Sequence, residues 1–238
     1  MNIEGRKALV LGGTSGIGLA AARRLAAAGA EVVAMSRSGG HLEAARAELG
    51  DGATVRPLDV LDRSAMAAAF EALAPFDILV NAATGGERAV GPFLEMDLDG
   101  FQRSFRKLWG YVNSVRLAAP LMPEHGSIVL VSGSPARKCL PGMSAISTVG
   151  NAVEGFVRAV APELAPRRIN VVSPGVIDTP MFAARGDARE RFLERATAGN
   201  LIRRAGDPDE VAMAIQFAIE NDFVTGTTID VDGGALLP

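Results

Sequence analysis

The strongest candidate for chemistry is a glycine-rich loop near the N-terminus, the stretch LGGTSGIG at residues 11–18. Gly12, Gly16 and Gly18 have a GxxxGxG spacing, directly between an apolar run and a helical pattern. Glycines at these positions let the backbone turn tightly and approach a pyrophosphate, whose charge is stabilised by the positive end of the following helix. The alternative is a helix start that happens to be glycine-rich, and the strand-loop-helix context favours the dinucleotide site.

Seven short apolar runs alternate with helical patterns and would position this loop. The runs are KALVLG, EVVAMS, ATVRPLD, FDILVNAA, GSIVLVS, RINVVSPG and TTIDVDG. Buried strands that alternate with helices imply a parallel sheet covered on both faces. The sequence therefore predicts an α/β fold, Rossmann-like and doubly wound, with a mostly parallel seven-stranded sheet. In such folds ligands bind beyond the carboxyl ends of the strands.

The composition limits the class of protein. The chain has 238 residues, of which 48% are hydrophobic, and a formal net charge of −3. These values predict one domain over residues 1–238, with no footprint for nucleic acid or for an anionic membrane. The glycine loop makes it a dinucleotide-binding domain. The one cysteine, Cys139, excludes an internal disulfide, and the start MNIEGRKALV shows no signal-peptide pattern, so we expect a cytoplasmic protein.

Several motifs, in order along nearly the whole chain, resemble those of the short-chain dehydrogenases/reductases. They are LGGTSGIG at 11–18, LDV at 58–60, LVNAAT at 79–84, VVSPGVIDTP at 171–180, and the C-terminal pair DPDEVA and VTGTTIDVDGG. Leu11, Ala82 and Thr84 depart from the family's usual residues. The resemblance implies a nicotinamide cofactor and a small-molecule substrate.

The resemblance also implies which residues contact the cofactor. Outside the second strand they are Gly12, Thr14, Ser15, Gly16, Ile17, Gly18, Asp59, Val60, Asn81, Ala82, Ala83, Pro174, Gly175, Ile177 and Thr179. Where the second strand ends, an acidic residue would accept hydrogen bonds from the adenine ribose, but this chain has Ser36, Arg37 and Ser38. Arg37 can pair with a 2′-phosphate and the serines can donate to it, so NADP(H) is the expected cofactor. The alternative is a solvated arginine at a loop start.

The family's four catalytic positions all fall on different residues here. The family has a Tyr, and a Lys four residues later, at the start of the helix that here begins MSAISTVGNAVEGF; these positions fall on Ile146 and Gly150. The family's Ser falls on Gly133 and its Asn on Lys107. Reduction of a carbonyl by a nicotinamide requires a proton donor near the developing alkoxide. We therefore expect an atypical member that lacks the Ser-Tyr-Lys set and has a relocated donor.

Lys107 is the first candidate for that donor. In the family the Asn and Lys positions are close, so we expect Lys107 to reach into the space that Gly150 leaves vacant. In a partly dry site its pKa would fall toward neutrality. The alternative is an exposed lysine in the basic run RSFRK. Tyr111, one turn later on the same helical face, is expected to be a core or interface residue.

Ser132, Ser134 and Lys138 complete the catalytic candidates. The serines flank Gly133 and could orient a carbonyl, although neither is acidic enough to donate the proton alone; either could instead satisfy the loop backbone. Arg137 and Lys138 could hold an anionic substrate or an oxyanion, or they could form an exposed charge pair.

Cys139 is expected to be structural, because no base is expected beside it. The two histidines, His41 and His125, belong to elements that we expect to lie away from the pocket. No metal site is expected.

Residues 181–205 resemble the family's mobile substrate lid. The candidates for its apolar inner face are Met181, Phe182, Phe192 and Leu193, and the residues expected nearby are Trp109, Leu140, Met143 and Ile146. Such a stripe could also be plain packing. A lipophilic pocket follows if these residues do gather there.

Three functions remain open. The first is an NADP(H)-dependent oxidoreductase for a small or medium organic carbonyl or alcohol. The second is a pseudoenzyme or sensor that binds NADP(H), and the third is an isomerase or lyase on the same fold. The resemblance also implies a homodimer or homotetramer, formed through two long helices expected at roughly 97–120 and 143–165.

Overall fold

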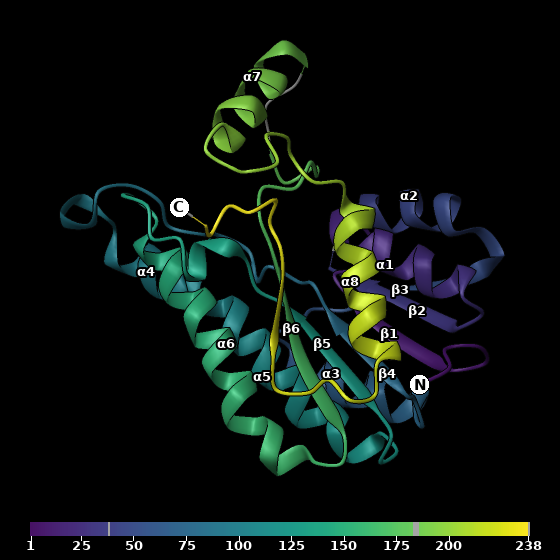
Figure 1. The fold of residues 1–238 in the computed structure, drawn as a ribbon. Coiled ribbons are helices and arrows are strands. Elements are labelled where there is room, and N and C mark those ends of the chain that lie inside the picture. Colours follow the sequence, from purple (N-terminus) through teal and green to yellow (C-terminus); the bar gives the residue numbers. More distant parts are fainter. Residues whose placement is uncertain (38, 183–185, 238) are drawn as a thin grey trace.

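The computed structural model describes residues 1–37, 39–182 and 186–237, and its centre is a seven-stranded parallel sheet with helices on both faces (Figure 1). The strand order is β3-β2-β1-β4-β5-β6-β7. The strands are β1 (Lys7–Leu11), β2 (Glu31–Ser36), β3 (Ala53–Pro57), β4 (Ile78–Asn81), β5 (Ser127–Val131), β6 (Arg168–Pro174) and β7 (Thr228–Val231). Each of the seven apolar runs in the sequence contains one of these strands, and the predicted doubly wound α/β fold is confirmed.

The helices form two layers. One layer contains α1, α2 and α8, and the other contains α3, α5 and α6 (Figure 1). The α-helices are α1 (Gly16–Ala27), α2 (Gly39–Leu49), α3 (Arg63–Leu73), α4 (Leu98–Ser104), α5 (Arg106–Ala118), α6 (Ser144–Leu164), α7 (Gly186–Thr197) and α8 (Pro208–Glu220). The 3₁₀ helices are η1 (Gly50–Gly52), η2 (Phe93–Glu95), η3 (Ala119–Leu121) and η4 (Ser134–Ala136).

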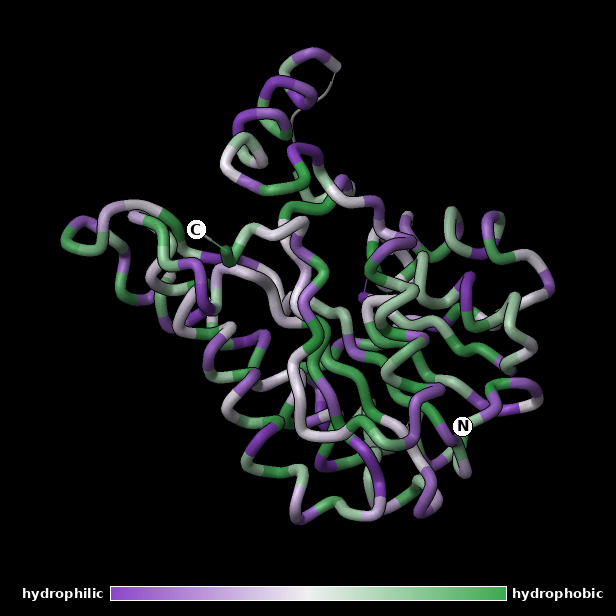
Figure 2. Tube along the Cα trace, viewed as in Figure 1, coloured by the Kyte–Doolittle hydropathy of each residue, from purple (hydrophilic) through white to green (hydrophobic). Residues whose placement is uncertain are grey.

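The core follows from the alternation of side chains along each strand. In β1, Ala8 and Val10 pack into the layer of α1 and α8, while Leu9 and Leu11 pack into the layer of α3, α5 and α6. Because both faces are covered, the central strands are apolar at nearly every position, and Figure 2 shows them as the most hydrophobic part of the trace. The sheet is therefore a rigid platform for the loops at its carboxyl edge.

The strand order reverses between β1 and β4, which are neighbours in the sheet although two strands separate them in the chain. The connections that leave these two strands run to opposite faces of the sheet. A crevice between the connections is the usual ligand site of an open α/β sheet. The glycine loop after β1 and the loop after β4 border this crevice.

The prediction of a single helix over roughly 97–120 is wrong, because the chain forms two helices, α4 and α5, on either side of Phe105. The turn at Phe105 is tight, and its N–H bonds to Gln102 O as in a 3₁₀ helix. Ser104 holds the end of α4 by donating to Gly100 O and accepting from Ala89 N, both at 2.9 Å. The second expected helix, at roughly 143–165, agrees with α6.

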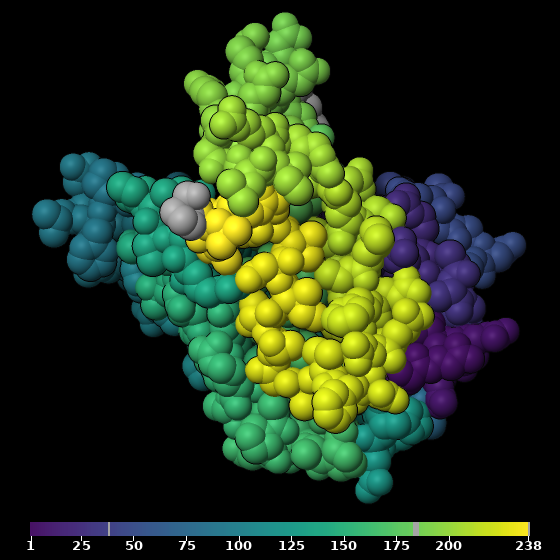
Figure 3. Space-filling view, in the orientation of Figure 1, coloured from purple at the N-terminus to yellow at the C-terminus, as the bar shows by residue number. Residues whose placement is uncertain are grey.

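Helix α7 stands above the rest of the molecule, and the C-terminal segment lies directly below it (Figures 1 and 3). The backbone N–H of Ile202 donates to Gly233 O at 2.9 Å, and Asn200 Nδ2 donates to Asp232 O at 3.4 Å. A Cβ on Gly234 would lie 2.9 Å from the side chain of Leu201, so the tail packs tightly under the return from α7. These contacts fix the C-terminal side of the α7 segment to the sheet.

No helix in the described ranges combines the length and apolar character needed to cross a bilayer. No group of three or more His, Cys, Asp or Glu side chains in the same ranges is arranged to hold a metal ion.

Candidate active site

A cleft of about 1170 Å³ runs along the carboxyl ends of the strands. It begins beside Ser36 at the end of β2, passes the N-terminus of α1, and continues between the loop after β6 and the first turns of α6. Of the residues expected to hold the cofactor, those that line it are Gly12, Ser15, Gly16, Ile17, Gly18, Ser36, Arg37, Val60, Ala82, Ala83, Pro174, Gly175, Ile177 and Thr179. The fold thus brings residues from five separate loops to one site.

The glycine loop has little room for side chains. Gly12 has a φ of +73°, and a Cβ there would lie 2.7 Å from Ala83 N; a Cβ on Gly18 would lie 2.1 Å from Gly12 O. Gly16 has a φ of +51° and faces Thr179 across the cleft. Loop, helix start and neighbouring strand therefore pack closely enough for backbone N–H groups to face a bound phosphate. This cradle fits the pyrophosphate of a nicotinamide dinucleotide.

Four predicted cofactor residues are not among those lining the cleft. Thr14 is buried, and Ser38 falls outside the described residues. Asn81 donates to Ser114 Oγ at 2.9 Å and accepts from Ala83 N at 3.0 Å, so it shapes the loop after β4.

The fourth is Asp59, whose Oδ1 accepts from Leu61 N at 2.9 Å. Its neighbours Leu58 and Val60 do line the cleft. The Asp59 carboxylate therefore holds the turn after β3 in shape beside the cleft wall.

The end of the cleft beside β2 has a positive character. Arg37 is exposed and lines the cleft together with Ser36 and His41. The expectation that His41 lies away from the pocket is wrong, because α2 begins at Gly39 and its first turn comes back over the end of β2. The other histidine, His125, is far from this edge and pairs with Asp77 at 2.8 Å.

Lys107 reaches the cleft from the first turn of α5. The chain after β4 holds this turn in place, because a Cβ on Gly85 would lie only 2.5 Å from Lys107 N. Lys107 Nζ donates to Ser132 O at 3.1 Å and lies 5.6 Å from the centre of the Tyr111 ring. Burial, together with the positive charge of Arg88, lowers the pKa of Lys107 to about 7. Its amine can therefore exchange a proton near neutral pH.

Tyr111 is a core residue, as the sequence predicts. It is fully buried, and its hydroxyl donates to Val131 O at 2.7 Å. Burial raises the pKa of Tyr111 above its usual range. Tyr111 therefore contributes its ring to the environment of Lys107, and its hydroxyl is committed to the backbone.

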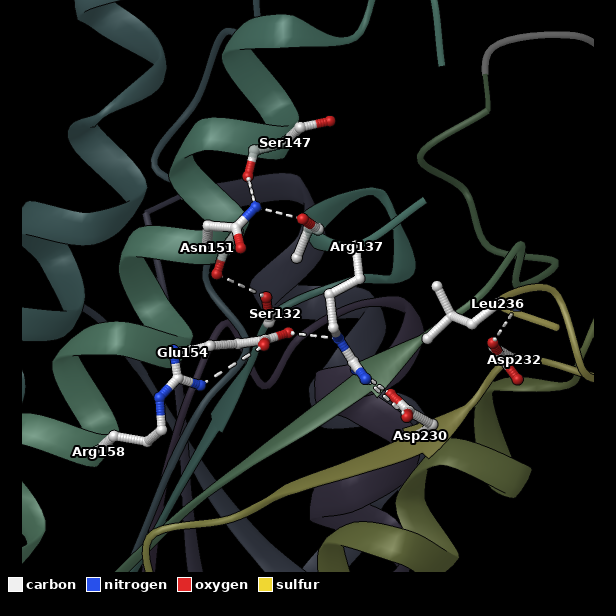
Figure 4. Close-up of polar contacts among 11 residues, drawn as sticks. Ser132, Arg137, Ser147, Asn151, Glu154, Arg158, Asp230, Asp232 and Leu236 are labelled. Carbon is white, nitrogen blue, oxygen red and sulfur yellow. Dashed lines mark hydrogen bonds and ion pairs between the residues drawn. The ribbon is translucent and has the colours of Figure 1, made fainter. Parts of the chain in front are cut away.

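The space beside Gly150 is filled by η4. A Cβ on Gly150 would lie 2.8 Å from Ala136 Cβ and 3.1 Å from Ala136 Cα. Asn151 on the next position donates to Ala136 O and to Ser147 O, which ties η4 to α6 (Figure 4). The expectation that Lys107 enters a vacancy left by Gly150 is therefore wrong. Its ammonium lies instead against the Ser132 carbonyl.

Arg137 is fully engaged in ion pairs. Its guanidinium binds both carboxylate oxygens of Asp230 and donates to Glu154 at 3.3 Å, while Arg158 approaches Glu154 from the other side at 3.8 Å (Figure 4). The carboxylates of Asp230 and Glu154 raise the pKa of Arg137. Arg137 thus links η4 to α6 and β7. The next residue, Lys138, lines the cleft.

The two serines next to Gly133 have different surroundings. Ser132 Oγ donates to Gly150 O at 3.2 Å, so its hydroxyl supports the backbone. Ser134 is buried, and it lines the cleft. Its hydroxyl has no hydrogen-bond partner within the described part of the chain. Ser134 is therefore the serine available to a ligand.

The far half of the cleft has an apolar wall. Its large apolar residues are Val90, Leu140, Met143, Ile146, Val149, Met181, Phe182 and Phe192. The rings of Phe182 and Phe192 pack at a tilt of 48° with centroids 5.0 Å apart, which joins α7 to the loop after β6. Arg189 ties the base of α7 to this loop by donating to Thr179 O at 2.8 Å and to Phe182 O at 3.0 Å.

Two of the expected apolar neighbours do not line the cleft. Trp109 is 60% exposed, because its position on α5 faces away from the sheet. Leu193 is partly buried on α7 and is not part of the lining, while Phe192 beside it is. A stripe read from the sequence cannot fix the rotation of a helix relative to the cleft.

Arg88 was not anticipated from the sequence. It follows β4 by seven positions, lines the cleft and contacts the sulfur of Met181 in the loop after β6. Its place in a loop after a strand, behind the pair Gly85 and Gly86, is the signal that could have marked it.

The family model and the solved structures that match this chain carry reductase or dehydrogenase names, and one similar curated protein is named as a binding protein. A family described as enoyl-(acyl carrier protein) reductase matches residues 12–235. The cyclic-di-GMP-binding biofilm dispersal mediator protein of Escherichia coli K12 is 35% identical over 236 residues, which cover 96% of this chain and 96% of that protein. A solved short chain dehydrogenase/reductase family protein is 37% identical, with a TM-score of 0.89 over 100% of both chains. A small-chain dehydrogenase solved in complex with NADPH is 30% identical, with a TM-score of 0.82 over 99% of this chain and 100% of that one.

The close packing at Gly150 predicts that an alanine there destabilises the protein, although alanine normally stabilises a helix relative to glycine. Gly150→Ala should lower the free energy of unfolding by about 1–3 kcal/mol, because the methyl group overlaps Ala136 and forces η4 outward. Gly155→Ala in the same helix is the matched control: nothing lies within 4 Å of its Cβ, and the gain in helix propensity should stabilise the protein by up to about 1 kcal/mol. Urea unfolding measures both, and a Gly150→Ala protein as stable as the Gly155→Ala protein would contradict this packing.

Proposed function

Because the chain belongs to the short-chain dehydrogenase/reductase family, we propose that it is an NADP(H)-dependent oxidoreductase in which Lys107 exchanges the proton. Its substrate is a small or medium organic carbonyl or the corresponding alcohol. The oxidoreductase class itself follows from the family. The cofactor type, the substrate class and the relocated proton donor are the proposal.

The proposal rests on the lowered pKa and the free N–H groups of Lys107 in the cleft. Its pKa of about 7 allows both protonation states near neutral pH, as a general acid-base group requires. Within the described residues, Lys107 Nζ has only the neutral carbonyl of Ser132 as a hydrogen-bond acceptor. An ammonium has three N–H groups, so two remain for a ligand. The described lining of the cleft contains no tyrosine, cysteine or carboxylate that could compete for this role.

A carbonyl substrate would bind between Lys107 and the loop that contains Pro174 and Gly175. When bound, the nicotinamide cofactor supplies hydride to the carbonyl carbon in the reductive direction. Lys107 Nζ donates its proton to the carbonyl oxygen, which becomes the hydroxyl of the product, and the neutral amine then takes a proton from water. Ser134 Oγ donates a second hydrogen bond to the same oxygen, and the Ser132 carbonyl keeps the amine in place.

Ile146 and Gly150 stand where the resemblance aligns the family's Tyr and Lys. Ile146 contributes an apolar surface to the cleft, and Gly150 lets η4 pack against α6. We propose that this arrangement replaces the Ser-Tyr-Lys set with an apolar surface and a lysine from the neighbouring helix α5.

The cofactor is NADP(H) in this proposal because Arg37 and Ser36 stand where the adenine ribose would lie. The described lining residues include no Asp or Glu, whose carboxylate would repel a 2′-phosphate. His41, beside Arg37, is a third group within the same end of the cleft. A relative of this chain was solved in complex with NADPH, which supports the same cofactor.

The chain is proposed to be one domain in which the segment 181–205, of which 183–185 lie outside the described residues, closes over the substrate. Met181, Phe182 and Phe192 present apolar surface to the cleft from this segment. We also propose a homodimer or homotetramer through α5 and α6, since Trp109 on α5 is 60% exposed. A cytoplasmic location stays a prediction.

A second candidate function is a cofactor-binding protein without turnover. It is favoured by the absence of tyrosine from the described cleft lining and by a relative that is named as a cyclic-di-GMP-binding mediator. A panel of carbonyls and alcohols, followed by absorbance of the reduced cofactor, separates the two candidates. Turnover of any of them supports the oxidoreductase.

The proposed cofactor contact predicts that NADP⁺ binds more tightly than NAD⁺. Arg37→Ala should weaken NADP⁺ binding roughly tenfold or more and leave NAD⁺ binding unchanged, because hydrogen bonds to charged groups contribute about 1.5–3 kcal/mol. Arg56→Ala, on the neighbouring strand β3 and outside the cleft lining, is the control. Calorimetry with both cofactors is the measurement, and equal losses for NADP⁺ and NAD⁺ would refute the role of Arg37.

If Lys107 is the proton donor, the turnover number should depend on pH, and replacement of Lys107 should remove that dependence. Reduction requires the protonated amine, so the turnover number should fall as the pH rises through about 7, the pKa of Lys107. Lys107→Met should lower turnover by about 10²-fold or more and remove this dependence, while NADP⁺ affinity stays the same. Lys107→Arg keeps the charge but cannot release a proton near neutral pH, so it should be as inactive as Lys107→Met. Unchanged turnover in Lys107→Met would remove Lys107 from the mechanism.

A further inference from the structure

The charges that line the cleft are all positive. The charged side chains in the described lining are Arg37, Arg88, Lys107 and Lys138, and no Asp or Glu accompanies them there. Arg37 belongs to the end beside β2, whereas the other three come from the loop after β4, the start of α5 and the loop after η4. Three cations therefore line the part of the cleft that lies away from the proposed adenine end beside β2.

Two arginines next to lining residues, Arg137 and Arg103, have carboxylate partners. Arg137 pairs with Asp230 and Glu154, although it is the direct neighbour of Lys138. Arg103 follows the same pattern and pairs with two acidic residues at 2.9 and 3.0 Å. In the described part of the chain, neither Lys138 nor Arg88 has an ion pair, and the polar contact of Arg88 is with the Met181 sulfur. The described lining of the cleft thus carries positive charge without a carboxylate beside it.

Lys107 is partly buried, and a desolvated cation without a counter-charge is unfavourable unless a ligand compensates it. The apolar wall of Leu140, Met143 and Ile146 keeps the local dielectric low, which strengthens the field of the three cations inside the cleft. An anion that enters with an apolar body would satisfy both the charges and the wall.

We propose that the substrate is an apolar oxo acid or hydroxy acid, whose carboxylate is held by Arg88 and Lys138 while its carbonyl or hydroxyl group faces Lys107. This inference rests on the proposed function and names its substrate class. The planar guanidinium of Arg88 suits bidentate contact with a carboxylate, and Lys138 adds a point charge from the opposite loop. The hydrocarbon part of the substrate lies against Leu140 and Ile146.

The test measures binding of a matched pair of non-reacting probes, octanoate and octanamide, by calorimetry in the presence of saturating NADP⁺. The two probes share their hydrocarbon chain and differ in charge. Octanoate should bind at least tenfold more tightly than octanamide. Arg88→Met and Lys138→Met should each weaken octanoate binding several-fold and leave octanamide binding unchanged.

Lys7→Met is the matched control variant. Lys7 begins β1 at the opposite edge of the sheet, so both affinities should stay as in the wild type. Equal affinity of the wild type for octanoate and octanamide would overturn the proposal, as would octanoate binding that is unaffected by both cleft variants. Octyl phosphate that binds tenfold more tightly than octanoate would overturn the assignment to a carboxylate.

The failure of this inference can be told apart from the failure of the proposed function. The probes do not react, so octanoate preference that depends on Lys138 would support the anion site even if no carbonyl is turned over. Turnover of neutral ketones with no preference over the matched oxo acids would overturn the inference and leave the oxidoreductase proposal intact.

Discussion

The contact between Gly150 and Ala136 is the constraint on which the rest of the site depends. Because Gly150 has no side chain, η4 packs directly against α6, and Asn151 fastens the contact by donating to the Ala136 carbonyl. The Ser132 hydroxyl can then donate to Gly150 O, while the Ser132 carbonyl remains available to Lys107. One missing side chain thus sets the shape of the wall and the position of the amine.

The electrostatics of the cleft follow from that packing. With η4 held against α6, Arg137 reaches Asp230 and Glu154 on the side away from the cleft, and its charge is neutralised there. Lys138, the next residue, lines the cleft, where Lys107 already lies without a carboxylate partner among the described residues. Burial of Lys107 lowers its pKa because water no longer stabilises the ammonium. The proposed proton exchange and the proposed anion site are therefore two consequences of the same positively charged cleft.

The sequence predicted the sheet and the glycine loop well because both depend on local patterns. Buried parallel strands leave continuous apolar runs, and a close approach such as that of Gly18 to Gly12 O requires glycine. The resemblance also led to Lys107 as a cleft residue. The vacancy expected beside Gly150 was wrong because the position of Ala136 is set by contacts between distant segments. Likewise, the directions of Trp109 and His41 depend on how their helices are rotated and placed, which no local pattern specifies.

The proposed mechanism requires that the amine of Lys107 titrates near neutral pH. The chain has three lysines, Lys7, Lys107 and Lys138, so their side-chain signals can be followed separately by ¹³C NMR of lysine-labelled protein. One lysine Cε resonance should titrate with a pKa of about 7, and this resonance should be missing in Lys107→Met. If all three resonances titrate near the ordinary lysine value of about 10.4, Lys107 is a solvated ammonium and not the proton donor.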